Sequence, residues 1–163
     1  MPGRGFFGET RDGADFMTNT RWYRYRDDIA PADAAFEAWG ATVRDMIIAS
    51  VDALTGVMVE NLDGIHDQVR RTIRVEADTL EMALFRLLDE LVYLKDAEGL
   101  FLRLDDAVIG DADGRVTIEA DARGEPIDPS RHELNTDVKA VTIHRFAVAE
   151  ENGGWKATVV ADT

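Results

Sequence analysis

The feature that most constrains the fold is a leucine repeat in the middle of the chain. Its steps of four and three residues place every leucine on one face of an α-helix, at Leu80, Leu84, Leu87, Leu91 and Leu94. Asp78 as N-cap, with Glu81 three residues later, resembles a capping box, so the helix is expected over about 79–95. Charged residues lie off the leucine stripe, and the helix therefore has to pack this stripe against another element.

The hydrophobic pattern changes its period after Gly99. Apolar and polar residues then alternate, as in half-buried strands, with the apolar positions at Leu100, Leu102, Leu104, Val116, Ile118 and Ala120. Residues 110–114 predict a turn between two such strands. Residues 124–134 contain two prolines and predict a long loop.

Two more strands are expected in the last quarter of the chain. The first covers 138–149 and should have four apolar residues facing inward, namely Val141, Ile143, Phe146 and Val148. A turn at 152–154 joins it to a last strand over 155–161.

The first half contributes three strands and a helix, expected over 21–26, 34–39, 41–58 (the helix) and 68–77. The full order is two strands, helix, strand, helix and four strands. This order predicts an α+β fold, with a mostly antiparallel β-sheet or partial barrel and two packed helices. Residues 1–20 are glycine-rich and lack periodicity, so they are expected to form a flexible extension before a single domain over 21–163.

The charge balance argues against several functions. The chain has 18 Lys plus Arg against 32 Asp plus Glu, a net charge of −14. Nucleic acids and anionic membranes are bound through clustered basic residues, so direct binding to either is not expected. The charge suits cations, a basic protein partner or a salty cytoplasm. With no cysteine, the chain has no disulfide, thiolate metal site or thiol nucleophile.

Neither a signal peptide nor a membrane-spanning segment is predicted. Residues 1–20 carry several charges and no long apolar stretch, and no run of 18 apolar residues occurs in the chain. A cytoplasmic protein is therefore expected.

Acidic residues at the ends of predicted strands are candidate metal ligands. Asp27, Asp28 and Asp33 surround the break between the first two strands, and Asp162 ends the last strand beside Thr163 and its terminal carboxylate. Oxygen ligands of this kind suit hard cations such as Ca²⁺ or Mg²⁺. By spacing alone, solvated surface charge is the simpler interpretation in so acidic a chain.

Lys139 is one of only three lysines and enters a strand of small apolar residues. It is either an ordinary edge residue or a group that pairs with carboxylate or phosphate in a site. The three histidines, His66, His132 and His144, have no metal-binding spacing, so structural or solvated roles are expected for them.

Three stretches of the sequence resemble the archease family. They are Gly124–Thr142, Asp89–Leu94 with the following Glu98–Phe101, and Gly154–Ala157 with Val160–Thr163. The resemblance covers about 21–163 and is most specific in the second half of the chain. The family's opening His-Thr-Ala-Asp corresponds to Ala30-Pro31-Ala32-Asp33, so the Ala-Asp pair is kept while the His and Thr are replaced.

The resemblance implies an archease-like fold and a function in tRNA splicing. Archease promotes guanylylation of the active-site histidine of the RNA-splicing ligase, so a non-catalytic protein cofactor is expected. It also implies a divalent cation, typically Ca²⁺ with Mg²⁺ or Mn²⁺ as alternatives, whose ligands match Asp33, Asp162 and Thr163. The family's functional lysine matches Lys139. The hypothesis is that this acidic tip enters the basic, metal-containing nucleotide pocket of the ligase.

Two other functions remain open. A metal-dependent hydrolase using Asp33, Asp162 and Lys139 would need a deep pocket with an open metal position and a general base. A chaperone or general interaction module would expose an apolar face on the helix over 79–95, whereas a helix in the core would bury its leucines.

Overall fold

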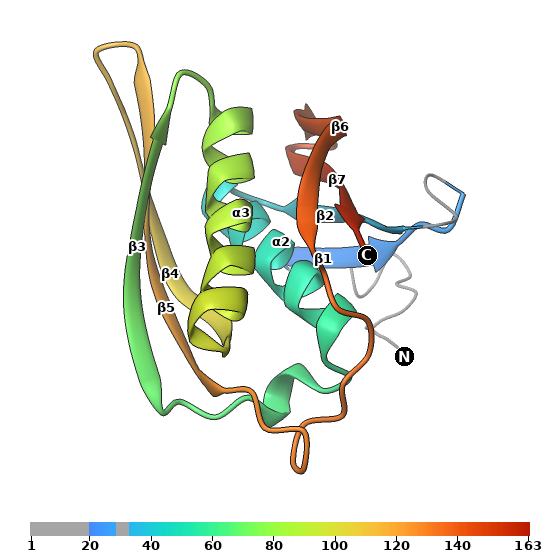
Figure 1. The fold of residues 1–163 in the computed structure, drawn as a ribbon. Helices are drawn as coiled ribbons and strands as arrows, with labels where there is room; N and C mark the ends of the chain where they lie inside the picture. The colour runs from blue at the N-terminus through green and yellow to red at the C-terminus, as the bar shows by residue number, and fades with distance from the viewer. Residues whose placement is uncertain (1–19, 29–32) are drawn as a thin grey trace.

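Two antiparallel sheets and two long helices make up the described part of the chain (Figure 1). The computed structural model describes residues 20–28 and 33–163. Residues 1–19 of the predicted extension and the aligned segment 30–32 lie outside the described residues. The α+β class is confirmed, with the strands in two separate sheets rather than a partial barrel.

The larger sheet has the strand order β1, β2, β7, β6, and every neighbouring pair is antiparallel. Its strands are β1 (Arg21–Tyr25), β2 (Ala34–Gly40), β6 (Ala140–Glu151) and β7 (Gly154–Asp162). β6 and β7 form a hairpin that turns at Asn152 and Gly153, with φ of 53° and 77°. Positive φ at both turn residues matches the twist of the strands, which is why an Asn-Gly pair predicted this turn.

The smaller sheet has the order β3, β5, β4, from β3 (Val69–Ala77), β4 (Leu100–Ala112) and β5 (Arg115–Pro126). β4 and β5 are longer than predicted, because the turn consists only of Asp113 and Gly114, with φ of 56° and 72°. The loop predicted over 124–134 also starts later than predicted, because β5 continues to Pro126. Pro126 still lies opposite Leu100. A proline is tolerated there because the pairing of β5 with β3 ends at Gly124, so that β5 is an edge strand at Pro126.

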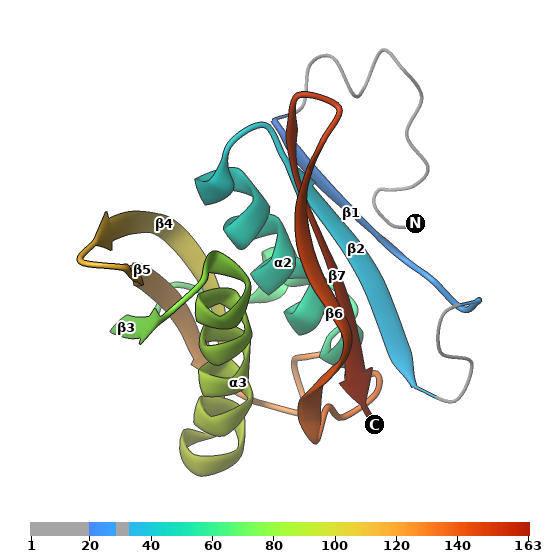
Figure 2. The ribbon, with the colours of Figure 1, turned by 90° about the horizontal axis from the view of Figure 1, so that it is seen from above.

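Helix α2 (Val43–Met58) lies between the two sheets (Figure 2). The Thr42 side chain accepts a hydrogen bond from the Asp45 amide and begins the helix. Because α2 packs against both β2 and β4, most of its side chains are buried, and the two sheets share one apolar core. A short 3₁₀ turn, η1 (Leu62–Gly64), follows it.

Helix α3 (Leu80–Glu98) carries the leucine repeat and contacts β3, β5 and β6. Leu84, Leu87 and Leu91 are all buried, as expected for a helix in the core. The N-cap is Thr79 rather than Asp78, since the Thr79 side chain accepts the Met82 amide. Among the described residues, neither helix is both long and apolar enough to span a bilayer.

One prediction about side-chain direction is wrong. Ile143 was expected to face inward, but it is 58% exposed. The register between β6 and β7 shifts between Thr142 and Ala147, so β6 bulges at this point, and Arg145 within the bulge has a φ of 62°. The extra residues of the bulge interrupt the alternation after Val141 and leave Ile143 outside the core, whereas Phe146 is buried, as predicted.

Candidate metal and lysine site

Three strand ends meet at one end of the larger sheet, with the end of β7 between the starts of β2 and β6 (Figure 2). Ala34 lies opposite Ala161 and Ala140 lies opposite Asp162. Continued by one residue, these registers place Asp33 opposite Asp162. The Lys139 amide donates a 2.8 Å hydrogen bond to the carbonyl oxygen of Asp162. The sheet thus brings together all four residues implied by the resemblance, and we call this region the tip: Asp33, Lys139, Asp162 and Thr163.

The two carboxylates of the tip lie at the ends of neighbouring strands, since Asp33 comes directly before β2 and Asp162 is the last residue of β7. Residues directly opposite each other in an antiparallel pair have Cβ atoms about 4.5–5.5 Å apart, and like charges there repel. Asp33 and Asp162 are both exposed, and no ion pair among the described residues involves either of them. A cation between the two carboxylates would remove this repulsion.

The oxygen atoms of the tip are of the kind that binds a hard cation, but its side chains alone are too few to complete a metal site. No three His, Asp or Glu side chains within 20–28 and 33–163 gather closely enough to hold a metal ion. Asp33 and Asp162 offer two carboxylates, so further oxygen ligands have to come from Thr163, water or a partner. A divalent cation at the tip therefore stays a prediction.

Lys139 lies at the tip directly before β6. Continued by one residue, the register of β6 and β7 places Lys139 opposite Thr163, next to the Asp162 position. Lys139 is exposed, and within the described structure it has no ion pair with either carboxylate. The tip thus presents carboxylates and an ammonium group side by side without neutralising them internally.

A hollow of about 640 Å³ adjoins the tip and has an acidic rim that includes Asp27, Asp33 and Glu60. Its wall is formed by Tyr25, whose hydroxyl donates a 2.9 Å hydrogen bond to the Ala53 carbonyl oxygen. Gly56 allows this approach, because a Cβ there would lie 2.5 Å from the Tyr25 hydroxyl. The acidic surface of the tip therefore extends towards the end of α2.

The segment that carries Lys139 is fastened along the end of α2. This segment, which we call the strap, covers residues 127–139 and connects β5 to β6. Backbone hydrogen bonds join it to the residues at and after the end of α2, from the Glu60 amide to Glu133, from the Asn135 amide to Met58 and from the Thr136 amide to Val57, at 2.9, 2.8 and 3.2 Å. The strap is therefore an ordered connection and not a free loop.

A buried carboxylate fixes the beginning of the strap. Glu125, 3% exposed, accepts hydrogen bonds from the His66 amide at 2.6 Å and from His132 Nε2 at 3.0 Å, and it pairs with Arg131. His132 Nδ1 accepts the Asp128 amide, which leaves Nε2 to donate to Glu125. Burial raises the pKa of Glu125, but these donors outweigh it and hold the pKa at about 2.

Lys95 fixes the end of the strap, and the sequence pattern did not reveal this role. Like the other charged residues of α3 it lies off the leucine stripe, yet its side chain is only 7% exposed. Its Nζ donates to Asp137 Oδ1 at 2.6 Å and to the Val138 carbonyl oxygen at 2.7 Å. Burial lowers the pKa of Lys95, but the bonds to Asp137 and Asp96 outweigh burial and raise it. The one sequence feature that could have pointed to Lys95 is the rarity of lysine in an arginine-rich chain.

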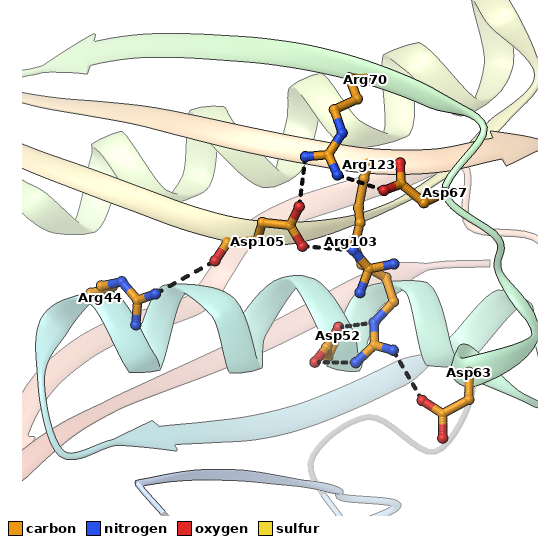
Figure 3. A network of polar contacts seen from close by, with 8 residues as sticks. All are labelled: Arg44, Asp52, Asp63, Asp67, Arg70, Arg103, Asp105 and Arg123. Atoms are coloured by element: carbon orange, nitrogen blue, oxygen red, sulfur yellow. Dashed lines mark hydrogen bonds and ion pairs between the residues drawn. The ribbon is translucent and has the colours of Figure 1, made fainter.

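A separate ion-pair network ties α2 to the smaller sheet and does not reach the tip (Figure 3). Arg103 on β4 binds both oxygens of Asp52 on α2, at 2.9 and 3.1 Å. Asp105 accepts from Arg70 on β3 and Arg123 on β5, at 2.8 and 2.6 Å. Because these arginines are paired with carboxylates, they do not form a basic surface that would attract RNA.

Comparison with known proteins adds an independent finding. The model of the Archease protein family matches residues 23–163. The proteins named archease from Pyrococcus furiosus and Methanopyrus kandleri are each 34% identical, over 143 and 132 residues. These alignments cover 87% and 80% of this chain, and 98% and 93% of the relatives.

Solved structures agree with the fold. The solution structure of protein 1598 from Methanobacterium thermoautotrophicum matches with a TM-score of 0.76 and 27% identity, covering 86% of this chain and 98% of that one. A crystal structure from Thermotoga maritima, titled as an archease and possible chaperone, matches with a TM-score of 0.54 at 19% identity, over 81% of this chain and 91% of that one. The second likeness concerns the fold alone.

Proposed function

Because the chain belongs to the archease family, we propose that it is a protein cofactor of the RNA ligase of tRNA splicing. In this role it promotes guanylylation of the active-site histidine of the ligase and so restores the ligase for another turnover. The observation that carries the proposal is the meeting of Asp33, Asp162 and Lys139 at one exposed end of the sheet. The chain itself performs no covalent chemistry in this proposal.

The tip is the part that would enter the ligase. Asp33, Asp162 and Thr163 would hold a divalent cation, most simply Ca²⁺, with Mg²⁺ or Mn²⁺ as alternatives. The cation would supply positive charge that links these carboxylates to oxygen ligands of the partner. Lys139, a compact ammonium on a flexible stem, suits a phosphate or carboxylate in the nucleotide pocket.

Charge supports a protein target rather than an RNA target. The chain has a net charge of −14, and the arginines of the network in Figure 3 are paired with carboxylates. An acidic surface is attracted to the basic pocket of a nucleotide-binding enzyme and is repelled by phosphate backbones. The partner of the tip is therefore proposed to be the ligase itself.

The two alternatives receive less support from the structure. A chaperone acting through an exposed face of α3 does not fit Leu84, Leu87, Leu91 and Leu94, which are only 0–6% exposed. A metal-dependent hydrolase needs a pocket with a general base beside the metal. Of Asp33, Asp162 and Lys139, only Asp33 lines the hollow at the tip, and the buried His132 is engaged by Glu125.

Single-turnover guanylylation of the cognate ligase tests the proposal. The wild-type chain should accelerate guanylylation, and Asp33→Ala, Asp162→Ala and Lys139→Ala should each lose most of this acceleration. Asp121→Ala is the matched control, since Asp121 is an exposed carboxylate on β5 of the other sheet. An unchanged ligase rate with the wild-type chain would remove the proposed function. If the three tip variants and the Asp121→Ala control were all equally active, the proposed function would stand and only the assignment of the site would be wrong.

A further inference from the structure

The buried ammonium of Lys95 lies beneath the start of β6. It comes from the last turn of α3, a helix that packs against β6 (Figure 1). The contacts of Lys95 Nζ are Asp96 at 2.6 Å, Asp137 at 2.6 Å and the Val138 carbonyl oxygen at 2.7 Å. An ammonium has three hydrogens to donate, so these three acceptors use its full capacity.

The two strap residues that Lys95 holds come immediately before Lys139. The Val138 side chain is fully buried, and its carbonyl oxygen is one of the acceptors of Lys95. On the other side of Lys139, its amide donates to Asp162. The backbone of Lys139 is thus held from α3 on one side and from β7 on the other.

Other contacts of the strap lie further from Lys139. Glu125 and His132 fix its beginning, fourteen and seven residues before Lys139, and the bonds to the end of α2 stop at Thr136. The contacts of Lys95, by contrast, fall on Asp137 and Val138, the two residues directly before Lys139. These two residues therefore set the position of the Lys139 backbone. Lys95 itself is too buried to touch a partner.

We propose that Lys95 is a positioning residue that aims Lys139 at the ligase. The inference rests on the proposed function, in which Lys139 contacts the nucleotide pocket. Its physical basis is that a flexible side chain acts well only from a fixed backbone, and a displacement of about 1 Å can lower a rate by about 100-fold. Removing the ammonium of Lys95 should release Asp137 and Val138 and let Lys139 move.

The first test measures order at Lys139 without the ligase. Lys95→Met keeps the length of the side chain and removes its charge, and Asp137→Asn removes the same ion pair from a side chain that is 68% exposed. Amide hydrogen exchange followed by NMR should be about tenfold faster at Lys139 in both variants, while core amides such as that of Leu87 keep their protection. Arg103→Met, which also removes a cation held by a carboxylate, is the control and should leave exchange at Lys139 unchanged.

The second test measures guanylylation of the ligase against the concentration of this chain. Lys95→Met should lower the maximal rate about tenfold and leave the half-saturating concentration nearly unchanged, because the carboxylates of the tip still dock. Arg103→Met should keep the maximal rate within about twofold. An equal fall in both variants would show a general loss of structure and overturn the proposal.

The two possible failures have different signatures. Unchanged exchange at Lys139 in Lys95→Met overturns the positioning role, whatever the ligase does. If exchange at Lys139 is faster in Lys95→Met but the wild-type chain never stimulates the ligase, the proposed function is wrong. The positioning of Lys139 by Lys95 would then stand, without an effect on guanylylation.

Discussion

His132 and Glu125 form a buried pair in which Nε2 of the imidazole lies 3.0 Å from Oε2 of the carboxylate. The pair joins the end of β5 to the strap and, through the His66 amide, to the segment after η1. Loss of this pair should therefore loosen the strap, which ends at Lys139, without removing any residue of the tip.

Glu125→Gln should lower the free energy of unfolding by about 1–3 kcal/mol at pH 7, because it weakens the acceptor for several buried donors. The folded-state pKa of Glu125 is about 2, below its ordinary value of 4.5. Its ionised form therefore contributes stability above pH 4.5, and this contribution is lost as the pH falls towards 2. Urea unfolding of both chains between neutral and acid pH measures the difference, which should shrink on acidification. A constant difference would contradict the assigned pKa.

Divalent cations should stabilise the fold through the tip. A ligand that binds only the folded state at about 100-fold above its Kd adds about 2.7 kcal/mol. Thermal unfolding with and without Ca²⁺ should show this shift for the wild-type chain and for Asp121→Asn. Asp33→Asn and Asp162→Asn should both lose it. A shift that survives in both tip variants would place the cation elsewhere.

Salt should weaken association with the ligase mainly through the rate of encounter. Raising NaCl from about 0.1 M to about 1 M shortens the Debye length from about 10 Å to about 3 Å. Surface plasmon resonance should then show a slower association rate and a much smaller change in dissociation. Asp33→Lys should reduce the salt dependence, while Asp121→Lys on the other sheet should change it less.

The leucine stripe of α3 should matter for stability and not for ligase activation. Leu87 is fully buried, so Leu87→Ala should lower the free energy of unfolding by about 2–5 kcal/mol. Tyr93 on the same helix is 59% exposed, and Tyr93→Ala should change stability by less than about 0.5 kcal/mol. Denaturant titration compares the two variants. Similar losses in both would contradict the packing of α3.

Much of the fold followed from hydrophobic period and turn chemistry. The stripe of α3, the alternation from Leu100 and the Asn152–Gly153 turn each predicted the element that is present. The errors occurred where contacts between distant parts of the chain determine the local structure. Thr79 caps α3 although Asp78 is an equally good capping residue, and Asp78 pairs with Arg115 instead.

The tip could be named from the sequence only through the family resemblance. No local pattern shows that Asp33 and Asp162 share a register position, because 128 residues lie between them and their pairing depends on β7 entering the sheet beside β2. Lys95 was missed for a related reason. Helical spacing placed it off the leucine stripe, and the acceptors that bury it come from the strap, far along the chain.

The bulge in β6 also bears on self-association. β6 is an outer strand of its sheet, and an unbroken outer strand offers a row of free amides to which another chain can add. Here the row is interrupted between Thr142 and Ala147, and the Val148 amide is already bonded to Glu81 of α3 at 3.1 Å. Glu81, expected to cap its own helix, thus covers a strand edge, and the sheet is protected against growing into an aggregate from this side.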